Sequence, residues 1–130
     1  MRLWHTDLLP YLPKSQLLAQ WRELNSIYAK QDNHILINYI YNYSKGYLYN
    51  YSLKVIGEMA QRGYIIRNLD NFNKYFNDYY NHVEDLRFKE HNDEYLLICY
   101  YNLKEKYLRG QKDFTPEIWN NLQNFIYKRG

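Results

Sequence analysis

The chain has 130 residues, a single cysteine and a formal net charge of +3. A chain of this length can bury a hydrophobic core without disulfides or metals, so we expect one domain spanning residues 1–130. One cysteine excludes an internal disulfide and a zinc site with several thiolate ligands. It fits a reducing compartment, and we expect the protein in the cytoplasm.

Targeting and membrane segments are not expected. The apolar run after Asp7 is too short for a signal peptide and is interrupted by Pro10 and Pro13. No uninterrupted apolar stretch approaches the roughly 18 residues of a membrane span. We therefore expect a soluble protein.

The charge is unevenly distributed. Eight basic and four acidic side chains give residues 1–67 a charge of +4, so residues 68–130 carry −1 of the total of +3. A polyanion-binding face would therefore come mostly from the first half, although ordinary surface charge explains the pattern equally well. The 17 tyrosines suit a helical core with a wet edge, and they can also stack on an unpaired base.

An arm and a helix are expected at the start of the chain. Residues 1–10 have no helical period, and prolines at positions 10 and 13 disfavour helix before them, which predicts an extended arm. A helix should then run from about Lys14 to Lys30. Its apolar residues recur at steps of three and four and form one buried stripe. The stripe consists of Leu17, Trp21, Leu24 and Tyr28.

Arg22 and Glu23 lie off this stripe. Glu23 shares the opposite face of the helix with Gln16 and Lys30. We therefore expect an Arg–Glu pair that points outward, either as a working surface or as a solvated face.

Three further stretches have clear helical signals. A second main helix is expected over 48–63, with Gly63 as a left-handed C-cap. A third should run over 92–110. A last helix should begin with Thr115 as its cap and a proline in its first turn, and residues 127–130 are expected to fray.

The remaining stretches are less regular. Apolar residues in 33–43 are too closely spaced to separate strand from buried helix, and we favour helix or irregular packing. Asp70 is expected to cap a short helix bearing Phe72, Phe76 and Tyr79. Because no stretch alternates with strand period, we expect an all-α fold of three main helices plus shorter ones, with the extended N-terminal arm crossing the bundle.

Common motifs for metal or nucleotide chemistry are missing. The histidines at positions 5, 34, 82 and 91 form no i, i+4 pair, and neither a P-loop nor a GxGxxG pattern occurs. Cys99 falls on an apolar helix stripe, which favours a core position over a nucleophile. We expect no metal and no cofactor.

Three segments carry motifs of a known family. Gln16-Leu-Leu-Ala-Gln-Trp-Arg-Glu-Leu24 resembles the first-helix motif of the pyrimidine-dimer DNA glycosylases typified by the bacteriophage endonuclease V. Glu58-Met-Ala-Gln-Arg-Gly-Tyr64 is similar to the end of that family's second helix, and Asn102-Leu-Lys-Glu-Lys106 is a weaker match. The opening Met-Arg-Leu-Trp-His resembles the family's bacterial branch, so we expect a bacterial or phage protein.

The resemblance implies an all-helical DNA-repair glycosylase with AP-lyase activity that flips a nucleotide out of damaged double-stranded DNA. The implied catalytic residues are Met1, whose free α-amine would form a Schiff base with the sugar, and Glu23, which would stabilise the sugar cation and move protons. An α-amine has a pKa of about 7.7–8.0, so part of it is neutral at physiological pH. The implied DNA contacts are Arg2, His5, Gln16, Arg22 and Lys106. We expect a monomer without a membrane partner.

The chain also departs from the family pattern. Arg2 stands where the phage enzyme has a small residue, and its bulk should prevent removal of Met1. Gln16 replaces a histidine and Ser26 replaces an arginine, which leaves the selectivity for dimers open. The aromatic and basic C-terminal segment of the family is not recognisable.

Several alternatives stay open. His5 is either a second proton carrier beside the amine or a structural hydrogen-bonding group. Glu23 without a nearby amine would be a solvated carboxylate, and the charges of Arg62 and Lys106 would complement helix ends. The chain as a whole would then be a non-catalytic module that binds damaged or distorted DNA, or a small helical interaction protein.

Overall fold

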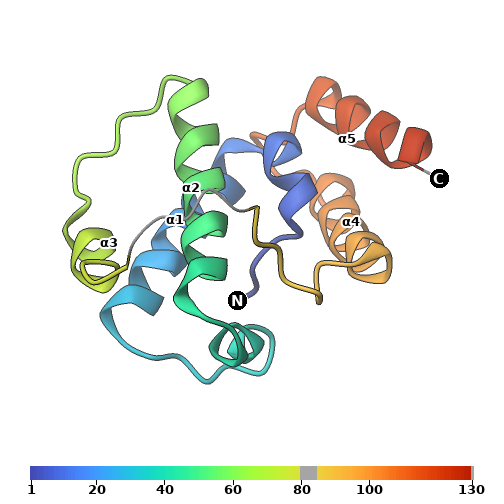
Figure 1. The fold of residues 1–130 in the computed structure, drawn as a ribbon. Helices are drawn as coiled ribbons and strands as arrows, with labels where there is room; N and C mark the ends of the chain where they lie inside the picture. Colours follow the sequence, from blue (N-terminus) through green and yellow to red (C-terminus); the bar gives the residue numbers. More distant parts are fainter. Residues whose placement is uncertain (80–84, 130) are drawn as a thin grey trace.

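The computed structural model describes residues 1–79 and 85–129 (Figure 1). These residues form α-helices and 3-10 helices and contain no strand, which confirms the all-α prediction for this part of the chain. The α-helices are α1 (Lys14–Ala29), α2 (Lys45–Gln61), α3 (Asp70–Tyr75), α4 (Asp93–Leu108) and α5 (Pro116–Arg129), and the 3-10 helices are η1 (Thr6–Tyr11) and η2 (Asn38–Asn42). None of the helices described is long and apolar enough to cross a bilayer.

Local signals fix most helix ends where the sequence predicts them. Gly63 has a φ of +82°, the left-handed conformation expected for the residue that ends α2. The Asn92 side chain accepts a hydrogen bond from the Tyr95 N–H at 2.9 Å and caps α4. The Thr115 hydroxyl accepts from the Ile118 N–H at 3.2 Å and caps α5.

Three local predictions are wrong. The arm is extended only through His5, because the His5 imidazole and carbonyl accept the N–H groups of Asp7 and Leu8 and start η1. Asp70 is the first residue of α3 and caps nothing with its side chain. Helix α5 continues to Arg129, whose ion pairs hold the end that was expected to fray, and Gly130 lies outside the described residues.

The N-terminal segment lies in the middle of the molecule. Figure 1 shows it between α1 and α2 on one side and α4 and α5 on the other. Helix α1 packs on α2 and α3, while η1 packs on α2 and α5. The buried leucines of this segment are at most 2% exposed, namely Leu3, Leu8, Leu9 and Leu12. The arm is therefore part of the core and has a fixed position.

Most aromatic side chains in the described residues serve packing. Tyr100 and Tyr107 of α4 stack on Trp119 of α5 with ring centroids 5.6 and 4.9 Å apart. Tyr28 of α1 packs against Phe72 and Phe76 in the α3 region. The aromatic residues therefore join the helices in pairs, as expected for a tyrosine-rich core.

Cys99 of α4 is completely buried, which confirms its predicted core position. Burial raises the pKa of its thiol, so little thiolate exists at neutral pH. A nucleophilic role is therefore not supported.

Candidate active site

A cleft of about 320 Å³ lies between the N-terminal arm, one face of α1 and the second half of α4. It is lined by Met1, Arg2, Trp4, Gln16, Ala19, Gln20, Glu23, Leu36, Asn102 and Lys106. Five of the seven site residues expected from the sequence belong to this lining. A larger cavity of about 460 Å³ between η1 and α5 contains none of the seven.

The cleft face of α1 differs from the expectation. Gln16, Gln20 and Glu23 follow one another at helical spacing and lie on one face. Glu23 is half-buried on this face, whereas Arg22 is exposed as predicted. The prediction of an outward Arg–Glu pair is therefore wrong for Glu23. The reason is that the arm covers a helix face that the local sequence marks as polar.

Gln20 connects the arm to the carboxylate. Its side chain is 0% exposed and makes four hydrogen bonds. Its carbonyl oxygen accepts from the Trp4 N–H at 2.7 Å and from the Tyr51 hydroxyl at 2.8 Å. Its amide nitrogen donates to the Arg2 carbonyl at 3.2 Å and to Glu23 Oε2 at 3.1 Å. One buried amide thus sets the position of the arm relative to Glu23.

The electrostatics of Glu23 depend on its burial and on the amine. Burial raises the pKa of the Glu23 carboxyl above its ordinary value, against the opposing effects of the N-terminal ammonium, Gln20, Arg22 and the Arg2 backbone. The Met1 amine is therefore close enough to act on this carboxyl, although the two groups form no ion pair within 4.0 Å. A carboxyl with a raised pKa exchanges protons more readily near neutral pH.

His5 is placed away from the cleft lining. Its side chain is 1% exposed and its ring stacks on His91 with centroids 5.5 Å apart. Its Nδ1 accepts the Asp7 N–H at 3.1 Å. Burial lowers the pKa of the imidazole, so the neutral form is favoured. This position supports the structural alternative for His5.

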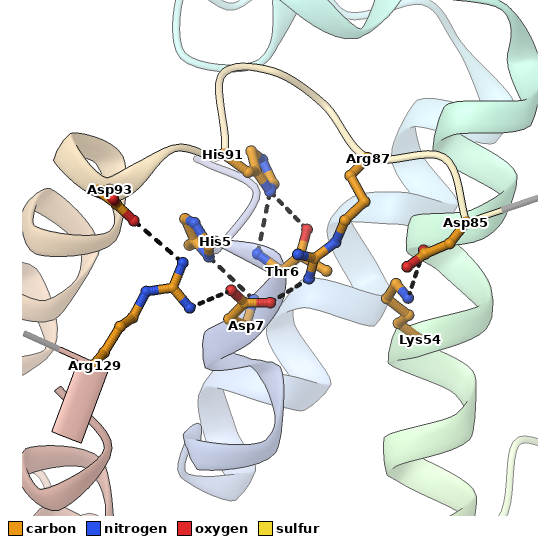
Figure 2. Close-up of polar contacts among 9 residues, drawn as sticks. All are labelled: His5, Thr6, Asp7, Lys54, Asp85, Arg87, His91, Asp93 and Arg129. Atoms are coloured by element: carbon orange, nitrogen blue, oxygen red, sulfur yellow. Dashed lines mark hydrogen bonds and ion pairs between the residues drawn. The ribbon is translucent and has the colours of Figure 1, made fainter.

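A charged network holds the start of η1, and none of its residues lines the cleft (Figure 2). The Asp7 carboxylate accepts hydrogen bonds from Arg87 and from Arg129, the latter at 2.7 Å. Arg129 also donates to Asp93 at 3.2 Å. Burial alone would raise the pKa of Asp7, but the two arginines outweigh it and lower that pKa. The start of η1 is thus bound to the end of α5.

His91 supports the same part of the arm. Its Nδ1 accepts the Thr6 N–H at 3.1 Å, and its Nε2 lies 2.7 Å from the Tyr39 hydroxyl. Burial lowers the pKa of His91 to about 3, and the nearby His5 and Arg87 add to this effect. A neutral imidazole therefore fills this position at neutral pH.

No group of three or more histidine, cysteine, aspartate or glutamate side chains in residues 1–79 and 85–129 is arranged to hold a metal ion. His82 lies outside these residues. The polar groups that line the cleft are amides, the Glu23 carboxyl and the cationic side chains of Arg2 and Lys106, and the two cations suit an anionic substrate.

Five lining residues are not among the site residues expected from the sequence, namely Trp4, Ala19, Gln20, Leu36 and Asn102. Gln20 and Asn102 both lie within the family motifs, at i+4 from Gln16 and i−4 from Lys106, so helical spacing could have found them. Leu36 lies in an irregular segment and had no such signal.

The fold and the cleft define a class, an all-helical protein in which the first residue and a half-buried glutamate line one cleft together with two cationic side chains. Residues 1–72 match a family model described as pyrimidine dimer DNA glycosylase. The match covers 72 of the 130 residues, and the chain belongs to this family. The matched part includes the arm, α1 and α2, and so all of the cleft except Asn102 and Lys106. No curated protein and no solved structure matches the chain.

Proposed function

We propose that the protein removes damaged bases, pyrimidine dimers among them, from double-stranded DNA and then cleaves the strand through a Schiff base on the Met1 amine. The observation that supports this most directly is the cleft shared by the Met1 amine and the half-buried Glu23 in a chain of this family. The protein acts as a monomer.

The reaction uses the amine as the nucleophile. The Met1 nitrogen attacks C1′ of the damaged nucleotide, and the C1′–base bond breaks as the base leaves with a proton. Opening of the sugar ring gives an iminium between Met1 and C1′. Loss of a C2′ proton then expels the 3′ phosphate by β-elimination, and water releases the sugar from the amine.

Glu23 serves this reaction in two ways. As a carboxylate it stabilises the positive charge that develops on the sugar, and with its raised pKa it carries protons to and from the reacting groups. A positioned acid–base group contributes roughly 10²–10⁴-fold in rate.

The cationic side chains hold the DNA. Arg2, Gln16 and Lys106 line the cleft, while Arg22 is exposed on α1 and lies outside the cleft lining. Phosphate contacts of this kind position the duplex without reading its sequence.

Borohydride trapping tests the mechanism. The protein is incubated with a duplex containing an abasic site, the iminium is reduced to a stable amine, and the adduct is mapped by mass spectrometry. The cleft contains a second amine, Lys106, so the mapping decides between them. We expect the adduct on Met1, and no adduct when extra residues precede Met1.

An adduct on Lys106, or cleavage that survives the N-terminal extension, would contradict the mechanism. Binding that depends on salt and gives no adduct would instead support the alternative of a non-catalytic module for distorted DNA.

A further inference from the structure

We propose that Ile35 and Leu36 form an apolar wedge that enters the base stack of duplex DNA and fills the space left by an extruded nucleotide. This inference rests on the proposed function, because a wedge serves an enzyme that must flip its target. It adds a way of recognising DNA that has lost its stacking.

The two side chains are unusually exposed for their type. Ile35 is 80% exposed and Leu36 is 42% exposed, while the next residue, Ile37, is completely buried. Exposure of adjacent aliphatic side chains to water is unfavourable, and their burial between base pairs would be favourable. The buried Ile37 anchors the turn that presents them.

Hydrogen bonds hold this turn in a fixed shape. The His34 carbonyl accepts the Ile37 N–H at 3.0 Å, and the His34 Nδ1 accepts the Leu36 N–H at 3.2 Å. The Asp32 side chain accepts the His34 N–H at 2.9 Å, and the Tyr41 hydroxyl accepts the Asp32 N–H at 2.7 Å. A rigid turn presents the wedge without a further loss of backbone entropy on binding.

The wedge is located beside the chemistry. Leu36 lines the cleft that also contains Met1 and Glu23. A duplex whose damaged nucleotide enters the cleft would therefore bring its opened base step to the wedge. Insertion of apolar side chains between base steps is an established way for proteins to kink and unstack DNA.

Exposure alone does not mark a wedge. Ile65 is 83% exposed and Leu108 is 70% exposed, and single exposed apolar residues are ordinary. Neither of these two residues lines the cleft. The combination of adjacent apolar residues, a braced turn and a place at the cleft distinguishes Ile35 and Leu36.

The test uses the double variant I35S/L36S and, as a matched control, I65S at an isoleucine of almost the same exposure. Two substrates are compared, a duplex with a single pyrimidine dimer beside 2-aminopurine and a single strand with an abasic site. The 2-aminopurine fluorescence reports the unstacking that accompanies binding, before any bond is cut. Single-turnover cleavage reports the chemistry.

We expect I35S/L36S to lose most of the fluorescence rise and to cut the dimer duplex at least about tenfold more slowly, which corresponds to about 1.4 kcal/mol. The single variant I35S, at the wedge residue that does not line the cleft, should lose fluorescence and duplex cleavage in the same direction, while its trapping on the abasic single strand, where nothing must be unstacked, should stay within about twofold of the wild type. The I65S control should match the wild type on both substrates.

Two other outcomes overturn the wedge, and a third overturns only the proposed chemistry. Equal fluorescence and equal rates in I35S/L36S and the wild type would show that these side chains do not enter the stack, while adduct formation by the wild type would leave the proposed function intact. Equal losses on both substrates would show that the turn only supports the cleft. If the wild type unstacks the duplex, I35S/L36S does not, and neither gives an adduct, the wedge is supported and the proposed chemistry is refuted.

Discussion

Gln20 Nε2 lies 3.1 Å from Glu23 Oε2, and the amide that makes this bond is completely buried. The same nitrogen donates to the Arg2 carbonyl at 3.2 Å. Gln20 therefore links the backbone next to Met1 directly to the Glu23 carboxyl. Gln20 is accordingly a positioning residue for the proposed chemistry, although it does not react itself.

The first prediction concerns Gln20→Glu. The substitution keeps the acceptor for Trp4 and Tyr51 but places a second carboxyl beside Glu23. Paired carboxyls raise each other's pKa, so the acidic limb of the pH–rate profile should move to higher pH, with a rate loss of roughly 10–100-fold at pH 7. Single-turnover cleavage across pH measures both effects. Gln61→Glu, at an exposed position on α2, adds the same charge elsewhere and should change neither. An unmoved limb in Gln20→Glu would contradict the positioning role.

The second prediction concerns Glu23→Gln. Turnover should fall roughly 10²–10⁴-fold, while stability at pH 7 should rise because a burial-penalised charge is gone. The sign follows from linkage. Because the pKa of Glu23 is raised in the folded state, the folded protein is most stable where Glu23 is protonated, below the ordinary pKa of 4.5. This stability is lost as the pH rises through the folded-state pKa of Glu23. The stability gain of Glu23→Gln should therefore appear above the folded-state pKa of Glu23 and disappear below the ordinary pKa of 4.5.

Thermal melts across pH test this second prediction. Glu58→Gln is the matched control, because Glu58 forms an ion pair with Arg62 at 2.8 Å. Removing that pair should lower stability at pH 7. If Glu23→Gln were also destabilised at pH 7, the burial argument for the raised pKa would fail.

The third prediction is acid sensitivity caused by His91. Its pKa is lowered to about 3 from 6.5, so the folded state resists protonation that the unfolded chain accepts. Its contribution to stability is complete above pH 6.5 and is lost as the pH falls toward 3, by up to about 1.4 kcal/mol per pH unit. Urea titrations should show a shallower pH dependence for His91→Gln than for the wild type. The same slope in both proteins would assign the effect to other groups.

The fourth prediction concerns the Asp7 network. Asp7→Asn weakens the ion pairs with both Arg87 and Arg129 and should cost about 1–2 kcal/mol at pH 7, since the Asp7 side chain is only 18% exposed. The pKa of Asp7 is lowered, so this stabilisation is present above 3.8 and is lost as the pH falls further. Chemical unfolding at pH 7 and pH 3 measures it. Asp78→Asn breaks a pair whose carboxylate is 76% exposed and should change stability by less than about 0.5 kcal/mol.

Local patterns predicted the helices well and the site only partly. Cap signals at Thr115 and Gly63 are read from neighbouring residues and were confirmed. The burial of Glu23 depends on an arm that crosses α1, and no periodicity within α1 reports what covers it. The ion pair between Asp7 and Arg129 joins positions 122 residues apart, so a single sequence contains no local sign of it.

Gln20, whose side chain makes four hydrogen bonds, illustrates the same limit of prediction from local sequence. It lies within the family motif, yet a glutamine in a helix is most often exposed. Its importance appears only when Tyr51 of α2 and the arm are brought to it by the fold.

The burial of Cys99 has a practical consequence for following DNA binding in real time. It is the only cysteine in the chain, it is completely buried, and its thiol pKa is raised, so maleimide dyes should leave it untouched. A cysteine introduced at exposed Ile65 would then be the one reactive thiol of an otherwise native protein. A dye at that position, paired with a second dye on the duplex, would report each docking and release event of a single enzyme molecule.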